Sequence, residues 1–364
     1  MRTRYRARAA GTLLVLAVAS ACGTSGAPEA PPAASPEQPP STQHQPEQRQ
    51  PEQRQPTILP PPAEPGAAPA QRAAPPGRVT ALPGGAPEGA VVDPKTGTLA
   101  VALRDPDRIA LLDPDGRVRE VAIPGAARHL SSGGPGTLLV PSEDRGTVLQ
   151  VQLPEGRVTS SVPVGDQPHD AATVPTGIAV TKESGGEVAL LRPDGRVTTE
   201  GGFVHPGGLT AVGDRIAAID VRANTLHVLD AANLRTVAVL PAGQGPSHVR
   251  PIGGGRVAVA DTRGHALLTY QVTGAPRQLG TTAVAGRAYG LATDPARGFV
   301  YTSAADRNEL VRLRVGDDGR LVDPRTVATV AQPNSIAVGP SGTVFVVGQQ
   351  PAQVQRLAPQ DFDR

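Results

Sequence analysis

The chain consists largely of short apolar runs separated by polar turns, and this pattern extends over its C-terminal three-quarters. The first group of runs covers residues 89–93, 98–103, 108–113 and 118–123. Each run has the length of a β-strand, is rich in Val, Leu and Ile, and is bounded by Gly, Pro or Asp. No window keeps a 3.6-residue apolar period over about ten residues. The pattern therefore predicts many strands and few helices.

Groups of four such runs recur along the chain, which indicates an internal repeat. The repeats follow one another at intervals of 37 to 45 residues and begin near residues 85, 126, 166, 203, 244, 286 and 331. In three repeats a Pro-Asp-Gly or Pro-Glu-Gly turn joins the third and fourth runs, at residues 113–117, 153–157 and 192–196. The period is that of a four-stranded propeller blade and not of a helical repeat. We therefore predict an all-β fold of seven four-stranded antiparallel blades, a β-propeller.

The last repeat lacks a fourth strand, and a matching strand stands at the other end of the repeat region. After the runs at 335–339, 343–347 and 354–357, about seven residues remain. Residues 78–83 read Arg-Val-Thr-Ala-Leu-Pro and match the fourth strands elsewhere, which begin with Arg-Val. We expect this N-terminal strand to complete the seventh blade, because closure of the ring removes its open sheet edges.

One repeat also carries a family signature. Residues 224–230 read Asn-Thr-Leu-His-Val-Leu-Asp, and several repeats are entered through a Gly-x-x-Pro segment. In these motifs residues 78–358 resemble the YVTN-type seven-bladed β-propeller repeat proteins. The resemblance implies the same architecture, but it leaves the function open because such propellers host unrelated activities.

The N-terminus has the features of a bacterial lipoprotein signal. Four arginines among the first eight residues precede an apolar stretch at 11–21, which is too short to span a bilayer as a mature helix. This stretch ends in small residues before Cys22, the single cysteine of the chain. We expect Cys22 to be lipidated and the mature protein to be extracytoplasmic and anchored to the bacterial cell membrane. The alternative is an ordinary secretory peptide with an incidental Cys22, and in both cases no internal disulfide can form.

A Pro-rich segment separates this signal from the repeats. Sixteen of the forty prolines lie at 23–77, and such a composition buries too little apolar surface to order itself. The expected organisation is a signal peptide at 1–21, a lipidated and disordered Pro/Gln-rich tether at 22–77, a propeller at 78–358 and a C-terminal tail at 359–364. The formal net charge is +2 without a basic stripe, which gives nucleic-acid binding no support. We expect a monomer.

The blade entries bring polar residues to one mouth of the central channel, because the first strand of each blade lines that channel. Four of the seven histidines fall at this position in consecutive blades. The candidate ring consists of Glu88, His129, His169, His205, His248, Tyr289 and Asn334. Three interpretations stay open: packing between blades, recognition of a small ligand, and a bound divalent metal. If the four histidines act as one binding arc, affinity should change as the pH crosses about 6 to 7.

Charged residues accompany this ring. Metal-binding histidines usually have a carboxylate that orients the ring, and in the sequence only His169 has one beside it, at Asp170. The loops after the second strands add charges of both signs, among them Glu143, Lys182 and Glu183. We interpret these charges as a solvated rim; the alternative is a docking surface for a protein or glycan.

The chain lacks the usual nucleophile, zinc-protease and phosphate-loop motifs. We therefore expect a tethered binding or scaffold module without a cofactor, which engages an envelope protein, a glycan or a small ligand on the face of the blade entries. The alternative is an enzyme. Residues 88–93 (Glu-Gly-Ala-Val-Val-Asp) resemble the metal-binding segment of the gluconolactonase and regucalcin propellers. That resemblance implies a Ca²⁺-dependent lactonase with Glu88 and Asn334 as ligands.

Replacement of Cys22 by Ala should move the protein from the membrane fraction to the soluble extracytoplasmic fraction, because the acyl chains are the expected anchor. Cell fractionation followed by immunoblotting measures this change. Thr24→Ala, two residues beyond the cleavage position, is the matched control and should stay with the membranes. A wild-type protein that is already soluble after secretion would refute the lipoprotein interpretation.

Overall fold

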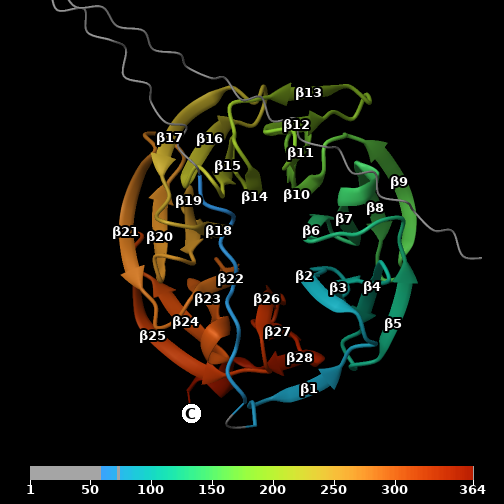
Figure 1. Cartoon of the computed structure of the whole chain (residues 1–364), viewed down its shortest axis with the longest axis vertical. Helices are drawn as coiled ribbons and strands as arrows, with labels where there is room; N and C mark the ends of the chain where they lie inside the picture. Colours follow the sequence, from blue (N-terminus) through green and yellow to red (C-terminus); the bar gives the residue numbers. More distant parts are fainter. Residues whose placement is uncertain (1–58, 72–73, 364) are drawn as a thin grey trace, which may run out of the picture. The chain divides into compact units, whose positions relative to one another are not determined.

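Seven four-stranded antiparallel sheets surround a central axis (Figure 1). The structure is a computed structural model that describes residues 59–71 and 74–363. The predicted signal peptide, Cys22 and most of the predicted tether lie outside these residues. The helices of the described part are three short 3-10 turns, η1 (Glu143–Arg145), η2 (Ala305–Arg307) and η3 (Pro359–Phe362), and none could cross a membrane. The prediction of an all-β, seven-bladed propeller is confirmed.

Each blade runs from an innermost strand at the channel to an outermost strand at the rim. The innermost strands are β2 (Ala86–Val92), β6 (Ser131–Gly134), β10 (Pro168–Val174), β14 (Pro206–Val212), β18 (Pro246–Gly253), β22 (Ala288–Asp294) and β26 (Pro333–Val338). The second strands are β3 (Leu99–Arg104), β7 (Thr137–Ser142), β11 (Gly177–Lys182), β15 (Arg215–Asp220), β19 (Arg256–Asp261), β23 (Phe299–Ala304) and β27 (Val344–Gln349). The third strands are β4 (Arg108–Leu112), β8 (Thr147–Gln152), β12 (Glu187–Leu191), β16 (Thr225–Asp230), β20 (Ala266–Gln271), β24 (Glu309–Val315) and β28 (Ala352–Leu357). The outermost strands are β5 (Val118–Ala122), β9 (Arg157–Pro163), β13 (Val197–Glu200), β17 (Thr236–Pro241), β21 (Arg277–Ala283), β25 (Leu321–Ala328) and β1 (Arg78–Ala81).

The hydrophobic core lies between neighbouring blades. The second strands are buried on both faces; β3, for example, reads Leu-Ala-Val-Ala-Leu-Arg, and its first five residues are buried. One cluster joins Ile219 of β15 to Val259 of β19. Another joins Leu99 and Val101 of β3 to Val347 of β27, across the junction of the first and last blades. Since both faces of a sheet are apolar, each blade is stabilised by its two neighbours.

Strand β1 closes the ring as predicted. It pairs antiparallel with β28, with Val79 opposite Gln355 and Ala81 opposite Gln353. Leu82, which directly follows β1, is buried in the same cluster as Val354 of β28. The two ends of the propeller therefore meet in one sheet, and the outermost strand of that sheet comes from the other end of the chain.

Irregular pairing at the blade entries directs their side chains toward the channel. In β10 the register shifts between Pro168 and Ala171, so His169 and Asp170 have no opposite partner in the ladder. Similar shifts follow the first proline of β2, β14, β18 and β26. A bulge of this kind re-aims a side chain relative to the regular alternation of a strand. The shifts leave Glu88, His169 and Asn334 outside the ladder, whereas His248 pairs with Ala260, and His129 and His205 precede the first strands of their blades.

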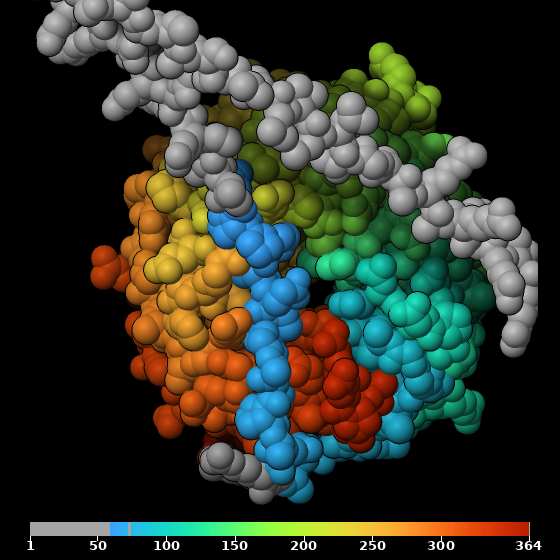
Figure 2. All heavy atoms as spheres, viewed as in Figure 1, coloured from blue at the N-terminus to red at the C-terminus, as the bar shows by residue number. Residues whose placement is uncertain are grey.

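Residues 59–71, which we call the strap, lie across the face of the propeller (Figure 2). Arg222 donates hydrogen bonds to the backbone carbonyls of Leu59 and Pro60, and Arg263 donates one to that of Pro61. At the other end, carbonyls of the strap accept hydrogen bonds from the side-chain amides of Gln332 and Asn308. The sequence predicted a disordered tether up to residue 77, but the strap packs on the propeller. The physical reason is that the propeller binds its backbone, so the strap needs few apolar side chains.

Deletion of residues 78–81 should lower the melting temperature by about 5–10 °C, because it opens the seventh sheet and exposes the cluster around Leu82. Differential scanning calorimetry measures the change. Val79→Thr is the matched control: this side chain is exposed, and Thr keeps the β-propensity, so its melting temperature should shift by at most about 1 °C. An unchanged melting temperature in the deletion variant would contradict the closing role of β1.

Candidate functional site

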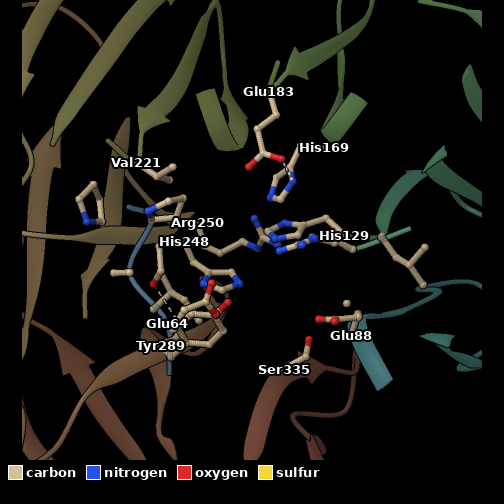
Figure 3. Close-up of a pocket in the computed structure, with 18 of the residues that line it drawn as sticks. Glu64, Glu88, His129, His169, Glu183, Val221, His248, Arg250, Tyr289 and Ser335 are labelled. Atoms are coloured by element: carbon tan, nitrogen blue, oxygen red, sulfur yellow. Dashed lines mark hydrogen bonds and ion pairs between the residues drawn. The ribbon is translucent and has the colours of Figure 1, made fainter. Parts of the chain in front are cut away.

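The channel mouth beneath the strap contains a cavity of about 310 Å³. Pro62, Ala63 and Glu64 of the strap form part of its lining (Figure 3). Six of the seven ring candidates also line it, namely Glu88, His129, His169, His205, His248 and Tyr289. The seventh, Asn334, is buried beside the cavity and donates a hydrogen bond from Nδ2 to Oε2 of Glu88 at 3.1 Å. The fold therefore brings the residues of the predicted ring together.

His169 lies between two buried glutamates from different loops. Its Nδ1 is 3.2 Å from Oε1 of Glu143, at the start of η1, and 3.6 Å from Oε2 of Glu183, directly after β11. Burial by itself would lower the pKa of His169, but the two carboxylates raise it to about 9. The same pairing lowers the pKa of Glu183 to about 2 against the effect of its burial. At neutral pH this group is an imidazolium ion held by two carboxylates.

The second oxygen of each glutamate also has a partner. Oε2 of Glu143 is 3.3 Å from Nη1 of Arg104. Oε1 of Glu183 is 2.8 Å from Nε2 of His205. Arg128 approaches the oxygen of Glu143 that faces His169, with its Nε at 3.5 Å. Arg104 and His205 thus hold the orientation of the two carboxylates on the side away from His169.

Asp170 connects several blades through one buried carboxylate. Its Oδ2 is 3.2 Å from Nδ1 of His129 and 3.5 Å from Nη1 of Arg250, and it accepts a hydrogen bond from the backbone N–H of Leu209. Burial opposes ionisation of Asp170, yet His129 and Arg250 hold its pKa well below the usual range. Burial lowers the pKa of His129, although Asp170 opposes this. The contact of the two side chains joins the entries of the second and third blades.

His248 and Tyr289 form the aromatic wall of the mouth. The ring of His248 stacks on that of His129 at 5.1 Å between centroids and meets the ring of Tyr289 edge-on at 5.0 Å. Burial holds the pKa of His248 well below its usual range, and its Nδ1 is buried without a hydrogen-bond partner. Burial and the nearby carboxylate of Glu64 raise the pKa of Tyr289. This wall is neutral at physiological pH.

The surroundings of the histidines differ from two expectations. His129, His169 and His248 do not share one titration range near pH 6 to 7, because the pKa of His169 is raised while those of His129 and His248 are lowered. His169 is also not the sole ring with a carboxylate beside it in space. Asp170, its neighbour in sequence, lies against His129, and the partners of His169 come from two other loops.

Sequence reasoning placed Glu143 and Glu183 on a solvated rim, but both are buried, Glu183 in the lining of the cavity and Glu143 behind His169. Each occupies the position directly after the second strand of its blade. The next two blades carry Val221 and Thr262 there, and Val221 also lines the cavity. A blade-by-blade alignment places an acid at this position in three consecutive blades, namely Asp105, Glu143 and Glu183, where the following blades have a less polar residue. The alignment marks the position, but it does not separate the two buried glutamates from the exposed Asp105. Arg128 and Arg250 had no such signal.

Other charged loop residues have structural roles. Asp261, at the end of β19, accepts hydrogen bonds from the backbone N–H groups of Gln244 and Gly245. Asp220, at the end of β15, accepts them from Val204 and His205. These carboxylates hold the entry loops of their own blades.

Comparison with solved structures shows the fold but not the function. No protein-family model and no curated protein sequence matches the chain. A streptogramin B lyase structure superposes with a TM-score of 0.66 at 14% identity, over 77% of this chain and 97% of the lyase. Virginiamycin B lyase from Staphylococcus aureus gives a TM-score of 0.63 at 13% identity, over 77% and 97%. A chain of a Mitotic Checkpoint Complex structure gives 0.67 at 14%, over 82% and 96%.

These similarities place the chain among the seven-bladed β-propellers. At such identities they define the architecture alone, and the neighbours include both enzymes and a component of a protein assembly.

The stability that His169 contributes should depend on pH in a defined direction. Because the pKa of His169 rises from 6.5 to about 9 on folding, its ion pairs stabilise the protein fully below about pH 6.5 and lose this effect as the pH rises through 9. The difference in free energy of unfolding between wild type and His169→Gln, measured by urea denaturation, should therefore shrink from pH 6.5 to 9. A Glu143→Gln/Glu183→Gln double variant should lose this pH dependence. A difference that stays constant or grows above pH 6.5 would contradict the ion-pair assignment.

Proposed function

We propose that this protein is a lipid-anchored, extracytoplasmic binding module that holds a small carboxylate-bearing ligand in the channel mouth. The observation that carries this proposal is the position of Glu64. It is the one acidic residue among residues 59–71, and it lines the mouth beside Tyr289 (Figure 3). The strap therefore presents to the mouth the chemical group that we assign to the ligand.

The charges around the mouth support a carboxylate ligand. Four cationic side chains lie at or beside the mouth, namely Arg104, Arg128, Arg250 and protonated His169. They contact Glu143, Asp170 and Glu183, and Arg128 and Arg104 also act on Glu88. Arg128 is the most exposed of these cations: its side chain is 45% exposed, and its single near carboxylate oxygen is 3.5 Å away. A guanidinium with unused donors is suited to a bidentate bond with a carboxylate.

The strap is suited to cover the mouth without filling it permanently. The contacts at its two ends are mostly hydrogen bonds from propeller side chains to its backbone carbonyls. Ala63 is its one buried apolar side chain within the described residues. A segment held in this way buries little apolar surface, so a ligand can displace it at small cost.

The alternative function is Ca²⁺-dependent lactone hydrolysis at Glu88 and Asn334. Two observations favour the binding module over it. Asn334 directs its N–H group, and not its oxygen, toward Glu88. Burial also raises the pKa of Glu88, although Arg128 opposes this, so burial disfavours the ionised carboxylate that a calcium ion binds.

The strap peptide provides a direct test of the proposal. A variant that lacks residues 59–71 should bind a synthetic peptide of that sequence, measured by isothermal titration calorimetry. The same peptide with Glu64→Gln should bind at least about 5-fold more weakly, because it lacks the carboxylate that the strap presents to the cationic mouth. The wild-type protein, whose mouth already contains the strap, should bind neither peptide.

Matched variants in the strap-deleted protein separate the mouth from the rest of the surface. Arg128→Gln should abolish the preference for the Glu64 peptide. Arg196→Gln, which changes an exposed arginine on an outer turn, should leave the preference intact. Equal affinities for the two peptides would overturn the proposal that the mouth recognises a carboxylate.

A further inference from the structure

We propose that Glu143, His169 and Glu183 form a site for one divalent transition metal ion, of the kind that zinc occupies, at the wall of the mouth. The inference deepens the proposed function and rests on it in one respect, since it takes the mouth as the ligand-binding end of the propeller. It adds a metal ion that the carboxylate of the ligand would bind.

Two of the three donor separations are close to those that a tetrahedral ion requires. One ligand atom from each of the three residues lies within 4.8 Å of the others. Nδ1 of His169 is 3.2 Å from the nearer oxygen of Glu143 and 3.6 Å from that of Glu183. Zinc bonds of about 2.0–2.1 Å in a tetrahedron place two donors about 3.3 Å apart. His169 is therefore positioned relative to both carboxylates as in a metal site, and a bound ion would replace the proton that its imidazolium form carries at neutral pH.

The surroundings provide an independent observation. In metal sites the ligating carboxylates are themselves held by outer partners. Here each glutamate turns one oxygen toward His169, while its second oxygen contacts another side chain: Arg104 for Glu143 and His205 for Glu183. An ion pair with His169 does not require that the second oxygen of both glutamates be held by another side chain. The three residues also come from two neighbouring blades, so the ring structure fixes their relative positions.

Access and coordination number favour a site with an open position. His169 and Glu183 line the cavity, so an ion held there faces the mouth. Three protein ligands leave the fourth tetrahedral position to an outside group, as in zinc sites that bind exogenous ligands. A carboxylate bound by Arg128 would lie close to this position. Arg128 shares an oxygen of Glu143 with the proposed ion, and its half-exposed side chain can turn toward solvent.

Metal binding by the purified protein tests this inference without any organic ligand. The full chain carrying Cys22→Ala is used, which removes both the lipid and a competing thiol. Titration calorimetry with Zn²⁺ at pH 7.5 should show one equivalent bound with micromolar or tighter affinity. The visible spectrum with Co²⁺ should be the intense spectrum of a four-coordinate ion. His169→Gln and Glu183→Gln should each weaken Zn²⁺ binding at least 10-fold.

Two control variants make the outcome decisive. His265→Gln changes an imidazole that bonds the Gly286 carbonyl and lies outside the cavity, so Zn²⁺ binding should be unchanged. His205→Gln, partly exposed and a contact of Glu183 alone, should weaken binding by a smaller factor than His169→Gln, which guards against loss through misfolding. Absence of stoichiometric Zn²⁺ binding, a six-coordinate Co²⁺ spectrum, or equal loss in His265→Gln would overturn the metal site. None of these results would change the peptide test of the carboxylate-binding mouth.

Discussion

The fold depends on the burial of two faces of every sheet. A blade of this propeller cannot bury both faces of its apolar second strand against a single neighbour. Leu99 and Val101 of the first blade, for example, pack against the last blade. The arrangement is therefore stable only as a closed circle. Strand β1 makes the closure by pairing with β28, and the chain returns to its own starting sheet after one full turn. The mouth residues are held in place by the same closure, since their partners lie on other blades.

The sequence was sufficient for those features that repeat. The period, the turns and the matching strand at 78–83 predicted the architecture, because each is a local pattern with a defined structural meaning. The ring of blade-entry residues followed from the same repeat. What could not be predicted are the pairings between blades. Asp170 is adjacent to His169 in sequence, but the bulge at the start of β10 sends the two side chains to different partners.

The strap was beyond sequence reasoning for a different physical reason. Its contacts involve backbone carbonyls, which every residue has, so its composition carries no signal of order. The strap is ordered instead by propeller residues far away in the sequence, such as Arg222 and Gln332, and their contacts with it depend on the folded propeller. A Pro-rich segment can thus be ordered by a surface that matches its backbone while having no core of its own.

The geometry of the strap also sets the order in which its contacts would break under load. The strap is joined to the propeller at β1 and crosses the face toward Arg222 and Arg263 (Figure 1). A pull on the chain before Leu59 would reach the hydrogen bonds of these two arginines first and peel the strap from that end, one contact at a time. Glu64 follows directly after this first group, whereas the contacts of Gln332 and Asn308 lie farther along. Tension would therefore withdraw the carboxylate of Glu64 from the mouth while the rest of the strap stayed attached. The force that opens the mouth would be lower than the force that detaches the whole strap.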